Sequence, residues 1–194
     1  MPSVRVTVSA RLFWLWWAKN REKIKSPILH FAPEESLSIG LRKFYGLEYQ
    51  TADLLHTSDI KLDIEKLDIE DRTIGTIICH HVLEHVDDSK ALKEVSRVLV
   101  EGGVFICSVP IIEGWEKTYR NDSLVGKDHR HEYFGQSDHL RYYGRDFRDS
   151  LLEARLHLDC EFTAEAEISV IYGLERGEKI FICSPIMSSF ATAR

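Results

Sequence analysis

The stretch "TIGTIICHHVLEHVDDSKALKEVSRVLVEGGVFICSVP", residues 73–110, decides the fold. Its first nine residues are rich in β-branched side chains and predict a buried strand. The following segment predicts an amphipathic helix, which Asp87 or Asp88 caps and which Gly102 and Gly103 end. The run "VFICSVP" then predicts a second strand that is apolar throughout. Apolar strands separated by amphipathic helices are typical of a parallel sheet that is covered on both faces.

The same alternation of apolar runs and helical patterns extends in both directions. Toward the N-terminus, the sequence predicts strands at Ile28–Phe31 and Leu47–Ala52 and a very short strand at Ile60–Leu62. Between the first two strands, Leu37, Leu41 and Phe44 recur at helical spacing and predict a helix. Toward the C-terminus, it predicts a helix with Phe147, Leu151 and Leu152 inward, and then a hairpin formed by "AEAEISVIYG" and "KIFICSP". The predicted fold class is α/β, a Rossmann-like, doubly wound, mostly parallel sheet with a C-terminal antiparallel hairpin strand.

The chain of 194 residues is long enough for one domain with its own core. We expect an N-terminal aromatic amphipathic helix within residues 1–27 and a single domain over residues 28–194. Residues 111–144 interrupt the pattern with a polar segment rich in His, Tyr, Arg and Gly. Because this segment is too long for a plain connection, it predicts a functional insertion.

Composition narrows the class of protein. Apolar residues make up 44% and charged residues 29% of the chain, which is typical of a soluble globular domain. The net charge of −6 argues against a general nucleic-acid binder. Three of the four cysteines, Cys79, Cys107 and Cys183, lie in apolar runs, which favours free thiols and a cytoplasmic location.

The segment "ARLFWLWWAK" near the N-terminus is too short to span a membrane, and no other segment reaches the roughly 18 apolar residues required. We expect it to form a helix that packs on the domain. Contact with a membrane surface through its Trp residues and the following Lys and Arg residues is the alternative. A homodimer is left open.

The first strand leads into the bend Ala32-Pro33-Glu34, where a nucleotide-binding fold would carry a glycine-rich loop. A pyrophosphate there needs backbone N–H groups and the positive end of a helix. Pro33 offers no N–H, and Glu34 and Glu35 place negative charge at that point. The bend therefore disfavours a dinucleotide and suits a cationic ligand without phosphate, although Pro and Glu are also ordinary residues at a helix start.

Three segments together resemble the class I S-adenosylmethionine-dependent methyltransferases, specifically the small single-domain type 11 group. They are "VLEHV" at residues 82–86, "RVLVEGG" at residues 97–103 and "HLRYYGRDFRDSLLEA" at residues 139–154. The resemblance covers about residues 28 to 185. Two departures stand out: "HFAPE" replaces the family's glycine loop, as in a subgroup that carries "LHFAPE", and "EARL" at residues 153–156 replaces "EAGF".

The resemblance implies S-adenosylmethionine as the cofactor and assigns its contacts. Phe31, Ala32, Pro33 and Glu34 would line the methionine part, Asp53 would bind the ribose, Asp63 and Ile64 the adenine, and Cys79, His80 and His81 would lie near the sulfonium. Replacing the loop glycines limits how closely the backbone approaches the ligand. We therefore expect weaker binding or a shifted pose compared with relatives that keep the glycine loop.

Six of the nine histidines form two clusters, His80, His81 and His85, and then His129, His131 and His139. His81 and His85 are four residues apart and would share a helix face, but no third ligand is fixed by spacing, so no metal site is predicted. In the second cluster we predict His131 and His139 as general bases, with Gln136, Arg141 and Tyr142 as substrate contacts. A solvated loop held by its own hydrogen bonds is an equal alternative.

The predicted function is transfer of a methyl group from S-adenosylmethionine to an oxygen or nitrogen of a small polar acceptor. The alternative is a methyltransferase-like protein that binds the cofactor weakly or not at all and serves as an interaction module. The missing glycines, the acidic bend and the aromatic N-terminus leave room for it. A nicotinamide-dependent oxidoreductase is disfavoured by Pro33 and Glu34.

Overall fold

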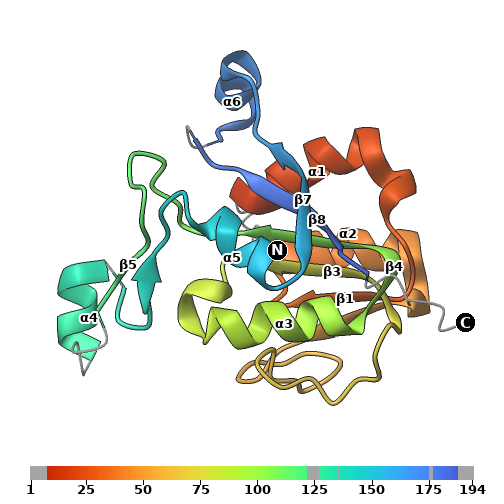
Figure 1. Cartoon of the computed structure of the whole chain (residues 1–194). Helices are drawn as coiled ribbons and strands as arrows, with labels where there is room; N and C mark the ends of the chain where they lie inside the picture. Colours follow the sequence, from red (N-terminus) through yellow and green to blue (C-terminus); the bar gives the residue numbers. More distant parts are fainter. Residues whose placement is uncertain (1–7, 122–126, 135, 175–176, 188–194) are drawn as a thin grey trace, which may run out of the picture.

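A six-stranded sheet forms the centre of the protein, which is described by a computed structural model over residues 8–121, 127–134, 136–174 and 177–187. The strand order is β2-β1-β3-β4-β8-β7 (Figure 1). The strands are β1 (Ile28–Phe31), β2 (Tyr49–Ala52), β3 (Ile74–His80), β4 (Leu99–Ser108), β7 (Leu156–Phe162) and β8 (Ile180–Pro185). The first four in this order are parallel, and β8 runs antiparallel to both β4 and β7. The predicted fold class is confirmed.

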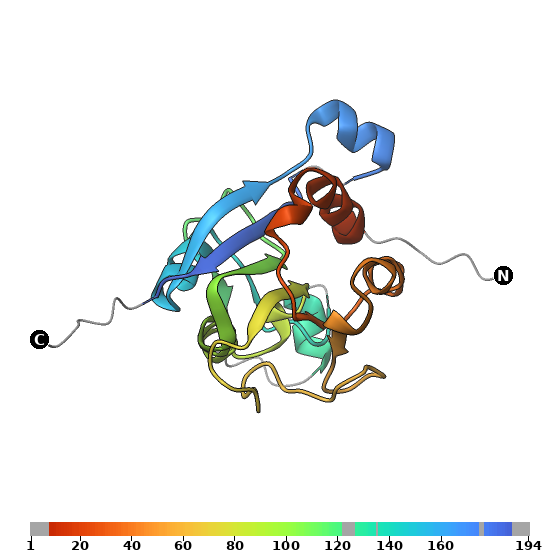
Figure 2. The same cartoon turned by 90° about the vertical axis from the view of Figure 1, so that its right-hand side faces the viewer.

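Helices cover both faces of the sheet (Figure 2). On one face, α1 (Val8–Asn20) and α2 (Glu35–Tyr45) enclose an apolar cluster that includes Phe13, Trp16 and Ile78. On the other, α3 (Asp88–Val98) and α5 (Phe147–Glu153) pack with Ile77 and Cys79. The side chains of successive residues of β3 thus pack on opposite faces of the sheet, as in any pleated strand. A strand buried on both faces must be apolar throughout, which explains the run that predicted it.

The N-terminal aromatic helix packs on the sheet, where Leu12, Phe13 and Trp16 are buried. Trp14 lies against Gly40 of α2, so closely that a Cβ atom at that position would stand 2.4 Å from the indole Cζ2. The Trp17 indole N–H donates to the Tyr45 hydroxyl over 3.0 Å. The amphipathic pattern of α1 is therefore explained by contacts within the chain. No helix in the described part of the chain is both long and apolar enough to cross a membrane.

Several element boundaries differ from the sequence prediction, and β2 begins at Tyr49 instead of Leu47. The Asp87 side chain caps α3 as predicted, but the helix ends at Val98, four residues before Gly102. Leu99 is already extended and pairs with Ile74 of β3. The pairing register then shifts, so that the next paired residues are Thr76 and Val104, and Gly102 and Gly103 lie inside β4. The short strand predicted at Ile60–Leu62 is reduced to a single parallel bridge between Ala52 and Ile60.

The predicted hairpin partner is wrong. Residues Ala166–Tyr172 form the helix α6, and the strand that pairs with β8 is β7. The apolar residues of "AEISVIY" suggested a strand, but Gly173 adopts φ +61° and closes a helical turn there. Because β7 and β4 fill both edges of β8, residues 166–172 are left as the connection between β7 and β8. Three apolar residues of α6 are consequently exposed: Val170, Ile171 and Tyr172.

Two non-glycine residues in the segments that depart from the resembled family have a left-handed backbone. Ala32 has φ +44° and Arg155 has φ +63°. An L-residue pays roughly 1–2 kcal/mol for this conformation. Glycine would adopt this conformation without that cost at either position.

The polar insertion lies beside α5 and projects from the main sheet (Figure 1). It contains β5 (Tyr119–Arg120), α4 (Lys127–Phe134) and β6 (Arg141–Tyr142), and β5 pairs with β6 in a separate two-stranded sheet. Three single 3₁₀ turns complete the described elements: η1 (Arg21–Lys23), η2 (Gly46–Glu48) and η3 (Leu83–His85).

Candidate functional site

The carboxyl ends of β1, β2, β3 and β4 meet at one edge of the sheet, where this fold class binds ligands. The register places Phe31 opposite both Ala52 and Cys79, and Cys79 opposite Cys107. The segments that follow these residues therefore lie next to one another. All predicted cofactor residues from Phe31 to His81 belong to this edge or to the loop after β2.

The bend after β1 presents a carboxylate. The Ala32 amide donates to the Ala52 carbonyl over 3.0 Å, and Pro33 has no amide hydrogen to offer. Glu34 immediately precedes α2 without a side-chain capping hydrogen bond, and its carboxylate lies 3.4 Å from the Nε2 atom of the buried His30. Burial raises the pKa of Glu34, but the hydrogen bond from His30 and the nearby His80 outweigh it and lower the pKa to about 2. The bend is therefore anionic at neutral pH.

The acids after β2 shape their own loops. The Oδ1 atom of Asp53 accepts from the amides of Leu55 and His56, each over 2.7 Å, which leaves Oδ2 facing the His56 ring at 3.4 Å. These backbone hydrogen bonds lower the pKa of Asp53 although its burial acts in the opposite direction. Asp63 closes a similar turn by accepting from the amide of Glu65, and Ile64 is buried in the core.

Cys79 and His80 point to opposite faces of the sheet, because they are neighbours on one strand. Cys79 is fully buried on the α3 side, where desolvation raises the pKa of its thiol. The His80 ring packs edge-on against Phe13 of α1, and its Nδ1 atom lies 3.0 Å from the Ser108 hydroxyl. Burial lowers the pKa of His80 to about 4, so the ring is neutral at pH 7.

His81 is the most connected residue of the edge. It adopts φ +52°, and its Nδ1 atom lies 3.3 Å from Glu84. On the other side, Nε2 lies 2.9 Å from the Ser9 hydroxyl and 3.7 Å from Glu178, to which Ser9 donates. Burial disfavours the charged ring, but the two glutamates outweigh it and raise the pKa of His81 to about 10. The imidazolium therefore links α1, η3 and the approach to β8.

Sequence reasoning missed two members of this cluster, Ser9 and Glu178. Ser9 is 72 residues from His81, and no local pattern connects either residue to the edge. Only the docking of α1 and β8 brings them to His81.

The predicted substrate residues occupy different environments. Gln136 is exposed, whereas Arg141 is buried, ion-paired with Asp88 and bonded to the Val86 carbonyl over 2.9 Å. The Tyr142 hydroxyl donates to the Phe134 carbonyl. His139 is buried beside His85, with 4.8 Å between ring centroids, and burial lowers its pKa. His131 belongs to α4, but its side chain lies outside the described residues, as does that of His129.

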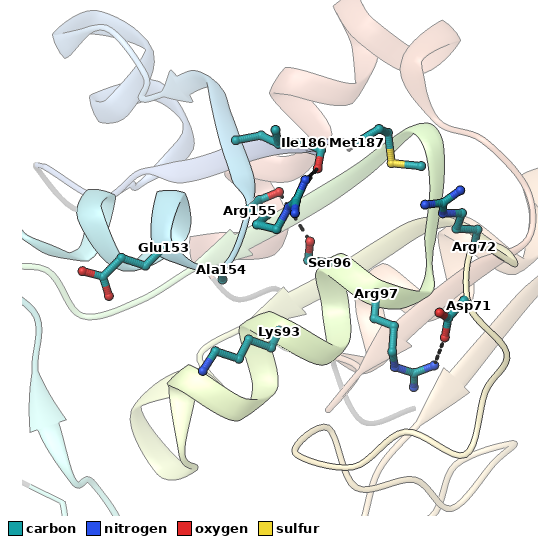
Figure 3. A pocket seen from close by; sticks show the side chains of 10 residues that line it. All are labelled: Asp71, Arg72, Lys93, Ser96, Arg97, Glu153, Ala154, Arg155, Ile186 and Met187. Carbon is teal, nitrogen blue, oxygen red and sulfur yellow. Dashed lines mark hydrogen bonds and ion pairs between the residues drawn. The ribbon is translucent and has the colours of Figure 1, made fainter. Parts of the chain in front are cut away.

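Two concave pockets lie elsewhere. The larger, with a volume of about 410 Å³, is lined by residues from α3, from the turn between α5 and β7, and from the segment after β8 (Figure 3). It lies near the start of β3, at the opposite end of the strand from His81. Its Arg97 pairs with Asp71, and its Arg155 donates to the Ile186 carbonyl. A smaller pocket of about 180 Å³ lies between α3 and α5.

One family model matches the middle of the chain. Residues 39–107 match the family model described as a methyltransferase domain. No curated protein matches the chain by sequence. The match covers 69 of the 194 residues and, together with the fold, supports the prediction of an S-adenosylmethionine-dependent methyltransferase.

Solved structures support the fold over most of the chain. A Burkholderia thailandensis 1,6-didemethyltoxoflavin-N1-methyltransferase, crystallised with 1,6-didemethyltoxoflavin and S-adenosylhomocysteine, has a TM-score of 0.64 at 13% identity, covering 93% of this chain and 79% of its own. An S-adenosylmethionine-dependent methyltransferase from Mesorhizobium loti gives 0.61 at 13% identity, covering 92% and 99%. A Pyrococcus horikoshii protein gives 0.57 at 17% identity, covering 90% and 87%. Identities this low establish the shared fold alone.

Proposed function

We propose that the protein binds S-adenosylmethionine at the carboxyl edge of β1, β2 and β3 and transfers its methyl group to an oxygen or nitrogen of a small polar acceptor. The observation that carries the proposal is the pair of carboxylates, Glu34 and Asp53, that follow the adjacent parallel strands β1 and β2. The low pKa of Glu34 keeps that carboxylate charged.

The chemistry of this edge fits the cofactor. S-adenosylmethionine carries an ammonium and a sulfonium group and no phosphate, and it supplies an already activated methyl group. Glu34 is suited to the ammonium group, and Oδ2 of Asp53, which accepts no backbone hydrogen bond and lies 3.4 Å from the His56 ring, is suited to ribose hydroxyls. Phe31, Ala32 and Pro33 would lie along the methionine part, with Asp63 and Ile64 at the adenine and Cys79, His80 and His81 near the sulfur.

The remaining work of the protein is to align the acceptor and to exclude water. The insertion, with Gln136, Tyr142 and the histidines His131 and His139, stays the predicted source of acceptor contacts and of a general base. A hydroxyl acceptor needs a base, whereas a neutral amine needs only positioning. The small-molecule substrate named for the Burkholderia neighbour supports a small acceptor by analogy only.

Calorimetric titration with S-adenosylhomocysteine tests the cofactor site. Asp53→Asn is the sharp variant, because an asparagine Oδ1 can still accept from the amides of Leu55 and His56 while the second oxygen is lost. We expect affinity to fall about tenfold or more, as for a hydrogen bond to a charged group. Asp71→Asn, at the far end of β3, is the matched control and should bind like the wild type.

The outcomes separate the alternatives. Equal affinity of Asp53→Asn and Asp71→Asn would remove Asp53 from the site. Absence of binding by the folded wild type would reject the proposal and favour the interaction module, for which α6 offers exposed Val170 and Ile171. If the cofactor binds, mass spectrometry of small polar metabolites incubated with it should reveal products heavier by one CH₂ unit.

A further inference from the structure

Three side chains that commonly bind metals converge where the insertion meets the end of β3. Glu84 and His85 belong to η3, and His139 lies two residues before the start of β6. One ligand atom from each lies within 4.8 Å of the other two. Glu84 and His139 are buried, and His85 is partly buried. The grouping depends on the fold, since His139 is 54 positions from His85 in the sequence.

The buried atoms of this cluster lack hydrogen-bond partners. Within the described part of the chain, Oε2 of Glu84 and Nδ1 of His139 have none, although the two residues are only 1% and 6% exposed. A buried polar atom without a hydrogen-bond partner destabilises the fold, because it has lost its contact with water. Both atoms are strong metal ligands, so a metal ion bound between them would satisfy both.

The surroundings orient the three side chains. The Nδ1 atom of His85 lies 3.3 Å from the Asp138 carbonyl oxygen and 3.4 Å from its carboxylate, so Nδ1 carries the proton and Nε2 keeps a lone pair. His81 holds the other oxygen of Glu84, Oε1. The Leu140 amide donates to the Glu84 carbonyl over 2.8 Å, which fixes the insertion against η3. In metal sites, the second ring nitrogen of a ligating histidine usually donates its hydrogen to a carbonyl or carboxylate, as Nδ1 of His85 does here.

We propose that Glu84, His85 and His139 bind a divalent first-row transition metal, with Zn²⁺ as the best match. Two imidazoles and one carboxylate suit Zn²⁺, whereas Mg²⁺ and Ca²⁺ prefer oxygen ligands alone. Donor atoms around a tetrahedral Zn²⁺ lie about 3.4 Å apart. Side-chain rotations that move the ligand atoms by little more than about 1 Å would bring the three residues to this spacing.

The metal would fasten the insertion to the end of β3 and leave one coordination position open. A water or an acceptor hydroxyl in that position would have a lowered pKa. The lone pair of His139 would then bind the metal instead of the acceptor's proton. This inference does not rest on the proposed cofactor site, and it revises the expectation that the chain has no metal site.

The test is a calorimetric titration of the full chain with Zn²⁺, after a chelator has removed any bound metal. We expect one Zn²⁺ per chain, and an affinity lowered by more than about tenfold in His85→Ala and in His139→Ala. His85→Ala is the variant of choice, because replacing Glu84 also removes a partner of His81. His157→Ala is the matched control, since that side chain is 65% exposed on β7 and should not affect binding.

Circular dichroism of each variant verifies that it is folded. Substitution with Co²⁺ provides an independent measurement, in which the visible bands should appear without a thiolate charge-transfer band. Failure of the folded wild type to bind Zn²⁺ would overturn the proposal and leave a polar cluster satisfied by water. Wild-type affinity in both histidine variants, or a thiolate band pointing to the exposed Cys160, would overturn it as well.

Discussion

The strongest structural prediction concerns Arg141, which sequence reasoning assigned to substrate. Its side chain is 2% exposed, and its guanidinium forms an ion pair with Asp88 at the start of α3. It also donates to the Val86 carbonyl over 2.9 Å. These contacts tie β6 of the insertion to the segment between β3 and α3. We therefore expect Arg141→Met to lower the free energy of unfolding in the absence of any substrate.

The magnitude follows from what the substitution leaves behind. Removing one partner of a buried ion pair costs about 3–5 kcal/mol, because the other charge remains uncompensated. The Asp88 side chain is 16% exposed and can recover some hydration. We therefore expect a loss near the lower end, about 3 kcal/mol, a large share of the roughly 5–15 kcal/mol that stabilises a domain.

Urea unfolding followed by tryptophan fluorescence and far-ultraviolet circular dichroism measures this loss. Arg145→Met is the matched control: Arg145 is 53% exposed and pairs with Glu116, which is 84% exposed. That surface pair should contribute less than about 1 kcal/mol. If Arg141→Met lowers the free energy of unfolding no more than Arg145→Met does, Arg141 has no structural role and the substrate assignment gains support.

Three further substitutions test other parts of the fold. Gly40→Ala should lower the melting temperature, since its Cβ would clash with Trp14 and overpacking costs about 1–3 kcal/mol; an unchanged temperature would argue against tight docking of α1. The hydrogen bond from Arg148, opposed by partial burial and aided by Lys179, lowers the pKa of Glu161 from 4.5 to about 2. A carboxylate with a depressed pKa stabilises the fold above pH 4.5, and this stabilisation is lost as the pH falls toward 2. At pH 7 the free energy of unfolding of the wild type should therefore exceed that of Glu161→Gln by about 1–2 kcal/mol, and this difference should vanish in acid. A constant difference across that pH range would refute the stabilising role of the ionised Glu161. Ala32→Gly should raise the free energy of unfolding by about 1 kcal/mol in urea, because glycine tolerates φ +44°, and a loss of stability would show that the bend is not strained.

Local pattern was sufficient for most of the sheet. Residues 73–110 predicted β3, α3 and β4, since an apolar run and a 3.6-residue period are properties of neighbouring residues. The same argument found β1 and α2, and the motifs at residues 82–86 and 97–103 resembled the methyltransferase family whose model matches residues 39–107. The prediction from local pattern was wrong about the hairpin, because residues 166–172 are apolar enough for a strand. Only the pairing of β7 with β8 excludes these residues from the sheet.

The sequence by itself determined the parallel sheet, the helices on it and the edge where a ligand belongs, because hydrophobic burial imposes a period that a single segment records. Only the tertiary structure decided which polar groups meet. Ser9, His81 and Glu178 come together through the docking of α1 and β8, and His139 reaches Glu84 and His85 through the return of the insertion. Such contacts depend on three-dimensional proximity between distant segments, and no spacing along the chain encodes it.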